Sequence, residues 1–215
     1  MRKLVDKIGT YFPLEKIPVG EFEQIKVNGM KFTIEQYEAK GLGNVSVMCA
    51  TGFFGLMKMD TLIINPSVCD APLFSYDRIL AMGNDTLIIE LYDTVLGEVN
   101  MEGIRKVKEA YAALPERDPG QHWYDNIKYP ESISKKGKKK ESAAFDSMTE
   151  AYLSEYLELA KCSANCEETQ KLEKASVYVE GLLTNGGPST DVFKKHYGEE
   201  KTAYLFRNIL FGTQK

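Results

Sequence analysis

MKMDTLIINPSVCDAPLFSYDRILAMGNDTLIIELYD, residues 57–93, is the stretch that decides the fold. Two apolar runs in it are joined by a loop that delivers Asp77 onto a strand. Runs of this length, rich in Ile, Leu and Tyr and bounded by Pro, Gly and Asn, are typical of strands. Because an acid inside an apolar sheet needs a structural or chemical reason, Asp77 is the first residue to examine for function.

Strand patterns continue toward the N-terminus of this stretch. Asn28-Gly29 separates two of them and favours a type I′ hairpin turn. Because adjacent strands with short links usually pair, we predict about six antiparallel strands in sequential order. The predicted strands are 21–27, 30–39, 44–51, 57–65, 74–82 and 85–93.

Beyond residue 100 the apolar residues recur at spacings of three and four, which predicts helices. Gly186-Gly187-Pro188 supplies a stop signal, and Gly198 precedes the last helical pattern. A strand-rich first half and a helix-rich second half predict an α+β fold, in one domain that spans 1–215. The predicted helices are 100–114, 142–163, 166–187 and 198–212.

A polar stretch, 115–142, lies between the predicted sheet and the later helices and holds the only tryptophan, Trp123. We expect it to be an exposed, mobile connection. Its lysine run is most simply a solvated loop. Because the chain is acidic, the alternative is a docking patch for an acidic partner, whose encounter complementary charge would speed. The lysines are Lys135, Lys136, Lys138, Lys139 and Lys140.

Composition argues against several classes of protein. The formal charge of −4 over 215 residues disfavours general nucleic-acid binding, which requires basic surface. The sequence has no run of about 18 apolar residues and no apolar signal segment, so we expect neither export nor a membrane partner. Four scattered cysteines favour a cytoplasmic protein without disulfides or a metal site. Two isolated histidines and the lack of nucleotide-binding glycine motifs disfavour zinc, Ser-His-Asp and nucleotide enzymes.

Strand alternation places Asp77 on the same face as Ser75. If that face meets an apolar pocket, desolvation raises the pKa of Asp77 and enables proton donation near neutral pH. The simpler alternative is a solvated edge residue or a turn acceptor. Glu90 and Asp93 are expected to face water, and no carboxylate pair follows while the register is unknown. Helical aromatic residues are core by default, with a planar-ligand pocket as the alternative: Tyr152, Tyr156, Tyr178, Tyr204 and Phe206.

Two cassettes in the chain carry a family pattern. The first runs from Ile63 to Pro66, through DAPLFSYD (70–77), to the strand that ends at Asp93. The second contains the run from Tyr178 to Thr190 and then FKKHYGEEKTAYLFRNILFG (193–212). Together they resemble the ferredoxin-dependent bilin reductases, which carry a Pro-Phe-Asp loop-strand segment and a Phe-Gly-Glu-x-x-Thr then Leu-Phe ending. The resemblance spans roughly residues 20–212 in order of elements, and these two cassettes are its specific part.

The resemblance implies a three-layer α/β/α sandwich with a central antiparallel sheet and an open-chain tetrapyrrole, such as biliverdin, between the sheet and the C-terminal helices. Electrons would come one at a time from reduced ferredoxin, with the lysine run as its docking surface, and the protein would hold no metal or flavin of its own. Asp77 matches the family's catalytic aspartate, which protonates the pigment radical. The positions that the resemblance places around the pigment are Thr61, Asn65, Phe74, Cys49 and Asn185.

Three positions depart from the family pattern. Thr61 stands where several members have a catalytic histidine, and Cys49 lies near a glutamate used by some. Asn185-Gly186-Gly187-Pro188 lacks the second aspartate of other members. Three hypotheses follow: a bilin reductase with Asp77 as proton donor, a non-catalytic protein of the same fold that binds a tetrapyrrole or other planar cofactor, and a structural protein without a ligand. Thr61 and Cys49 favour the second over the first, whereas Asp77 and the C-terminal cassette disfavour the third.

Overall fold

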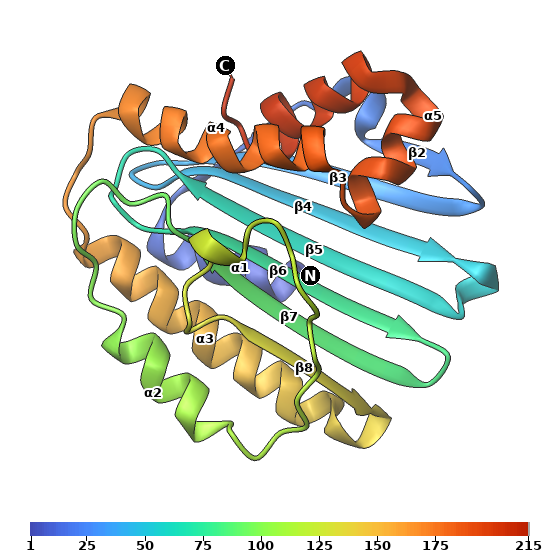
Figure 1. The fold of residues 1–215 in the computed structure, drawn as a ribbon, viewed down its shortest axis with the longest axis horizontal. Helices are drawn as coiled ribbons and strands as arrows, with labels where there is room; N and C mark the ends of the chain where they lie inside the picture. Colours follow the sequence, from blue (N-terminus) through green and yellow to red (C-terminus); the bar gives the residue numbers. More distant parts are fainter. Residues whose placement is uncertain (215) are drawn as a thin grey trace.

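One antiparallel sheet organises the computed structural model, which describes residues 1–214. Its strand order is β1-β3-β4-β5-β6-β7-β8, and β2 pairs with the far end of β3, so eight strands lie within the described residues. Figure 1 shows the long strands running side by side. Their bounds are β1 Leu14–Ile17, β2 Gln24–Val27, β3 Met30–Ala39, β4 Gly43–Gly52, β5 Met57–Pro66, β6 Leu73–Ala81, β7 Asn84–Tyr92 and β8 Ile133–Lys138.

Helices cover both faces of this sheet, so the predicted α+β class and its three layers are confirmed (Figure 1). One face packs against α1 (Arg2–Tyr11) and α3 (Ser142–Cys162), with α2 (Glu102–Ala110) lying on α3. The other packs against α4 (Glu168–Asn185), α5 (Pro188–Tyr204) and a π-helical turn, η5 (Leu205–Leu210). Among the described residues, no helix has the length and apolar character needed to cross a bilayer.

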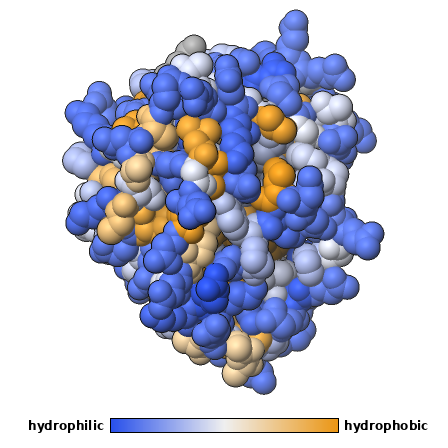
Figure 2. All heavy atoms as spheres, turned by 60° about the vertical axis from the view of Figure 1, so that its left-hand side comes forward, coloured by the Kyte–Doolittle hydropathy of each residue, from blue (hydrophilic) through white to orange (hydrophobic). Residues whose placement is uncertain are grey.

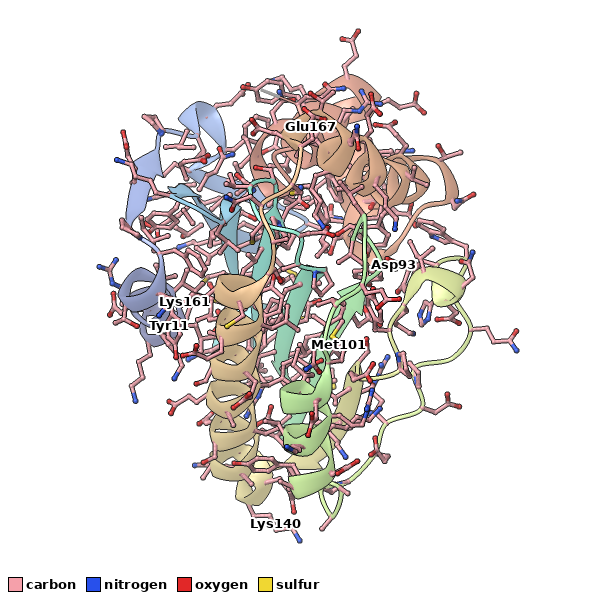
Figure 3. All side chains as sticks on the ribbon, turned by 90° about the vertical axis from the view of Figure 1, so that its left-hand side faces the viewer. Tyr11, Asp93, Met101, Lys140, Lys161 and Glu167 are labelled. Carbon is pink, nitrogen blue, oxygen red and sulfur yellow. The ribbon has the colours of Figure 1, made fainter. Side chains whose placement is uncertain are left out.

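Each face of the sheet has its own apolar core, because strand side chains alternate between faces. Phe74 and Tyr76 of β6 pack toward α3, whereas Met48 and Ile63 of β4 and β5 pack toward α4, α5 and η5. At the edge of the first core, the Lys161 ammonium lies 6.0 Å from the ring of Tyr11 and ties α3 to α1 (Figure 3). Whether a strand residue can contribute to a site on one face therefore depends on whether its position is odd or even along that strand.

The turn and cap signals of the sequence are confirmed. Asn28 and Gly29 both have positive φ, 49° and 78°, as a type I′ turn requires. Gly186, with φ of 80°, ends α4. Gly198, with φ of 79°, interrupts α5, so the last helical segment restarts where the sequence predicts.

The lysine run and its surroundings differ from the predicted mobile connection. Residues 133–138 form β8, which pairs with β7, and the sheet has eight strands rather than six because β1 and β8 are also present. Lys135 is buried, and its ammonium bonds to the carbonyl of Leu114 at 3.1 Å and to Glu116 at 2.5 Å. Lys135 is therefore a strand residue with a buried, hydrogen-bonded ammonium group, not part of a docking surface.

A buried ion pair fastens α4 to the loop between β5 and β6. The fully buried Lys171 ammonium contacts Asp70 at 3.0 Å and donates to the carbonyls of Ala71 and Thr94, each at 2.7 Å. Burial lowers the pKa of Lys171, and the bond to Asp70 opposes that shift. Loss of either charge would leave the other desolvated and unpaired.

Asp70→Asn is expected to lower the free energy of unfolding by about 3 kcal/mol, since it leaves the buried Lys171 without its anion. Urea denaturation measures the change. The matched control is Asp93→Asn, which breaks a half-exposed pair with Lys174 and is expected to cost less than about 1 kcal/mol. Equal losses in the two variants would contradict the role given to burial.

Candidate functional site

Asp77 lies in the middle of β6, between Thr61 of β5 and Ile88 of β7. Two residues along, Ser75 lies between Ile63 and Glu90. Directly paired residues share a face, so the side chains of Thr61, Ser75, Asp77 and Glu90 all point toward α4 and η5. Register thus collects four polar side chains at the centre of an otherwise apolar layer.

These side chains line a cavity of about 140 Å³ between the sheet and the C-terminal helices. The floor comes from β4 to β7, and the roof comes from the segment before β8, from α4, from the first turn of α5 and from η5. Floor residues are Met48, Thr61, Ile63, Ser75, Asp77, Glu90 and Tyr92; roof residues are Tyr124, Tyr178, Leu182, Gly187, Ser189, Thr190, Phe206, Leu210 and Phe211.

Asp77 is the acid whose proton affinity the cavity changes most. Burial raises its pKa to about 6, and repulsion from Glu90 acts in the same direction. The hydroxyl of Thr61 donates to Oδ1 of Asp77 at 2.5 Å and opposes the shift, because it stabilises the carboxylate. Asp77 can therefore hold a proton in mildly acidic solution and release it near neutral pH.

Glu90 is the second carboxyl group of the cavity. Tyr92 donates to its Oε2 at 2.6 Å, and the Lys128 ammonium lies 3.6 Å from its Oε1. Lys128 also contacts Asp125 at 2.7 Å and lies over the ring of Tyr124. A positive group thus reaches the rim of the cavity beside Glu90. Among the described residues, Asp77 has only the Thr61 hydroxyl as a side-chain hydrogen-bond partner.

Stacked aromatic rings form one wall of the cavity. Tyr92 and Tyr178 stack with ring centres 4.0 Å apart, and Tyr124 meets both edge-on. Trp123 stacks on the outer side of Tyr178 at 5.8 Å. It reaches this position because Gly181 has no side chain; a Cβ there would lie 2.1 Å from the Trp123 ring. Flat, apolar walls with a few polar groups suit a planar conjugated ligand.

Side chains of the sheet hold the end of η5, which forms part of the roof. Asn65 of β5 donates to the carbonyl of Phe211 at 2.7 Å, and Ser46 of β4 donates to that of Leu210 at 2.7 Å. Asn44 donates to Leu210 at 3.1 Å, and Gln36 donates to the carbonyl of Asn208 at 2.8 Å. These amides and hydroxyls satisfy carbonyls at the end of the π-helical turn.

The structure brings only part of the predicted site together. Asp77 and Thr61 both line the cavity. Asn65 is fully buried beneath Phe211 and acts as an anchor for the roof. Asn185 is the exposed last residue of α4, and Gly187 lines the cavity in its place.

Two of the predicted residues, Cys49 and Phe74, lie on the opposite face of the sheet. Phe74 packs on Tyr156 of α3, with ring centres 4.8 Å apart. Cys49 is paired with Asp60, and burial raises the pKa of its thiol to about 12. Their strand parity is opposite to that of Asp77, so neither contacts the cavity.

Glu90 and Tyr92 are site residues that the sequence reasoning did not select. The signal that would find Glu90 is the two-residue turn at Met82-Gly83, with positive φ at both positions. Counting back from this turn pairs Ala81 with Asn84 and hence Ser75 with Glu90. Glu90, which the sequence predicts to face water, is therefore a diagonal neighbour of Asp77 on the cavity face.

Comparisons with known proteins place the fold. Neither a scan against protein-family models nor a search of curated proteins finds a match. Among solved structures, the chain is similar to phytochromobilin synthase from tomato in complex with biliverdin, with a TM-score of 0.78. The match covers 99% of this chain and 81% of that one, at 15% sequence identity. The two proteins share the fold that the resemblance implies.

The raised pKa of Asp77 predicts a pH-dependent stability. Between the ordinary pKa of 3.8 and the folded value of about 6, the folded state keeps a proton that the unfolded state has released. This stabilisation is complete below about pH 4 and is lost as the pH rises through 6. Relative to the wild type, Asp77→Asn is expected to gain stability with rising pH across this window, by up to about 3 kcal/mol in the free energy of unfolding.

Urea unfolding at a series of pH values measures the difference between the two proteins. Thr61→Val is the matched control, because it removes the hydrogen bond that lowers the pKa of Asp77 and should move the window to higher pH. Identical pH profiles for the wild type and Asp77→Asn would show that this carboxyl has an ordinary pKa.

Proposed function

We propose that the protein reduces a linear tetrapyrrole, with Asp77 as the proton donor and an external one-electron carrier such as ferredoxin. The observation that carries the proposal is the Asp77 carboxyl, with its pKa near 6, in an aromatic-walled cavity between the sheet and the C-terminal helices. The fold supports the same proposal, since a protein of this fold has been solved with biliverdin. The two sequence cassettes add their resemblance to bilin reductases.

The chemistry adds two electrons and two protons to one double bond of the pigment. After each electron arrives, Asp77 transfers its proton to the reduced pigment and becomes a carboxylate, which the Thr61 hydroxyl stabilises. Asp77 then takes up a second proton from solvent before the second transfer, and repulsion from Glu90 favours this uptake because it raises the pKa of Asp77. The aromatic wall positions the conjugated rings.

The cavity has to widen for this substrate. Its volume of about 140 Å³ is below the roughly 300–1,000 Å³ of sites for drug-sized ligands. The sheet holds the end of η5 through Asn65, Ser46 and Asn44, so this part of the roof is anchored. We place the opening at the segment with Trp123 and Tyr124, which meets Tyr178 of α4 through one stacked and one edge-on ring contact.

Biliverdin added to the purified protein is expected to give a shifted visible absorption spectrum and to quench Trp123 fluorescence. Quenching follows because the single tryptophan stacks on Tyr178, a wall of the cavity. The matched control is Gly181→Leu, which displaces Trp123 and should alter the quenching more than the binding. If the wild-type protein leaves the absorption spectrum of biliverdin unchanged, the proposed bilin site is excluded.

Asp77→Asn is expected to bind biliverdin with nearly wild-type affinity but to lose reduction by about 100-fold or more when reduced ferredoxin is added, or to stop at a radical. Turnover is followed by absorption and the radical by electron paramagnetic resonance. Thr61→Val, which keeps the carboxyl, should retain turnover with a shifted pH profile. Undiminished turnover in Asp77→Asn would remove Asp77 as the donor.

Thr61 also favours a second candidate, a non-catalytic protein that binds a tetrapyrrole or another planar cofactor. A threonine hydroxyl is not an acid that can replace the catalytic histidine that several bilin reductases have at this position. A spectral shift without any turnover, under conditions where a known bilin reductase turns over, would favour this candidate over reduction.

A further inference from the structure

Large apolar side chains stand in solvent at one end of the sheet. Phe53, Phe54 and Leu56 form the turn between β4 and β5, and Met82 is in the turn between β6 and β7. Phe54 is fully exposed and Met82 is 91% exposed. Both turns project from the same end, on the right in Figure 1. On the face drawn in Figure 2, by contrast, hydrophobic residues form small groups among hydrophilic ones.

The fold gains nothing from these residue types. Phe53, Phe54 and Met82 have φ between 50° and 55°, the left-handed conformation that Gly or Asn adopts at lower cost. No neighbouring side chain covers Phe54, whose exposure is complete. A polar residue at either turn would be easier to fold and more soluble.

Lysines surround the apolar turns. Lys26, Lys31 and Lys58 lie in one row across the sheet, one residue behind the last pair of the β4–β5 hairpin, Gly52 and Met57. Lys26 directly faces Lys31, an arrangement of like charges that weakens a strand pair. Lys138–Lys140 follow at the adjoining end of β8, where Lys138 pairs with Asn84 beside the Met82 turn.

The nearby acids offset only part of this positive charge. Asp85 is buried and neutralised by Arg78, which also contacts Asp146 at 3.5 Å. Glu141 is mostly buried against the backbone of Lys138 and the ammonium of Lys140. This end of the molecule is therefore basic, although the chain as a whole has a formal charge of −4.

We propose that this end of the sheet docks on a bilayer surface that contains anionic phospholipid. Phe54 and Met82 enter the boundary between headgroups and acyl chains, and the lysines contact lipid phosphates. The spacing fits, because the row with Lys58 lies only about 3.3 Å behind the last strand pair, at headgroup depth when the turns are inserted. The proposal does not depend on pigment binding and differs from the sequence expectation of no membrane partner.

A bilayer fits this surface better than an acidic protein does. A protein interface needs a closely packed apolar centre with a matching partner shape, whereas these side chains stand separately on two protruding turns. Fluid lipid accommodates separate insertions without a matching shape. The basic end also lies about four residues, or roughly 13 Å, along β6 from Asp77, at the end of the strand rather than over the cavity.

Cosedimentation with phosphatidylcholine vesicles, with and without phosphatidylglycerol, tests the proposal. The wild type is expected to bind only the vesicles with phosphatidylglycerol, and less at high salt. The Phe54→Ser, Met82→Ser double variant should lose binding by roughly tenfold or more, from the lost insertion of two apolar side chains. The matched control is Val177→Ser, an exposed apolar residue of α4, which should bind as the wild type does.

The depth of insertion is measured with the Phe54→Trp, Trp123→Phe double variant. Brominated lipid should quench the fluorescence of its single tryptophan, at position 54. Equal vesicle binding by the wild type and the Phe54→Ser, Met82→Ser variant would overturn the proposal. So would a wild-type protein that does not cosediment with vesicles containing phosphatidylglycerol. If the Phe54→Ser, Met82→Ser variant instead loses affinity for reduced ferredoxin while vesicles bind neither protein, the surface belongs to a protein partner and the bilayer proposal is wrong. Unchanged thermal unfolding of the variants confirms that their folds are intact.

Discussion

The register that pairs Thr61 with Asp77 and Ser75 with Glu90 decides which side chains face α4 and η5. A slip of one residue would send all four to the face that packs on α3 and would replace them with apolar side chains. The two-residue turn at Met82-Gly83 and the anchors beneath η5 hold this register from opposite ends. The chemistry of the cavity therefore depends on backbone pairing as much as on the acids.

Much of the architecture could be predicted from periodicity and turn residues, including the Asn28-Gly29 hairpin, the helix stop at Gly186 and the restart at Gly198. The segment that the sequence misplaces is the lysine run, because Lys135 is a buried strand residue, whereas a polarity profile indicates a solvated loop at this run. The resemblance implies that Cys49 and Phe74 lie in the same site as Asp77, whereas strand parity places both on the opposite face of the sheet. Glu90 required the register, which depends on turn geometry rather than on local composition.

Two opposing influences act on Asp77. Burial and Glu90 favour its protonated form, whereas the Thr61 hydroxyl favours the carboxylate. An acid balanced in this way can give up a proton and regain it, which a strongly stabilised carboxylate or an always neutral acid does poorly. Thr61 has no acidic proton of its own, but its hydrogen bond lowers the pKa of the neighbouring Asp77.

Side chains from three successive strands, β3, β4 and β5, hold the carbonyls of residues 208–211. All the partners in the sheet precede the segment that they bind by 146 to 172 residues. During synthesis the floor of the cavity can form before the part of its roof that η5 supplies, because residues 205–211 follow the sheet in the chain. Loss of residues 205–211 would leave most of the sheet intact and yet leave the cavity open on that side, so the sheet and η5 make separable contributions to one site.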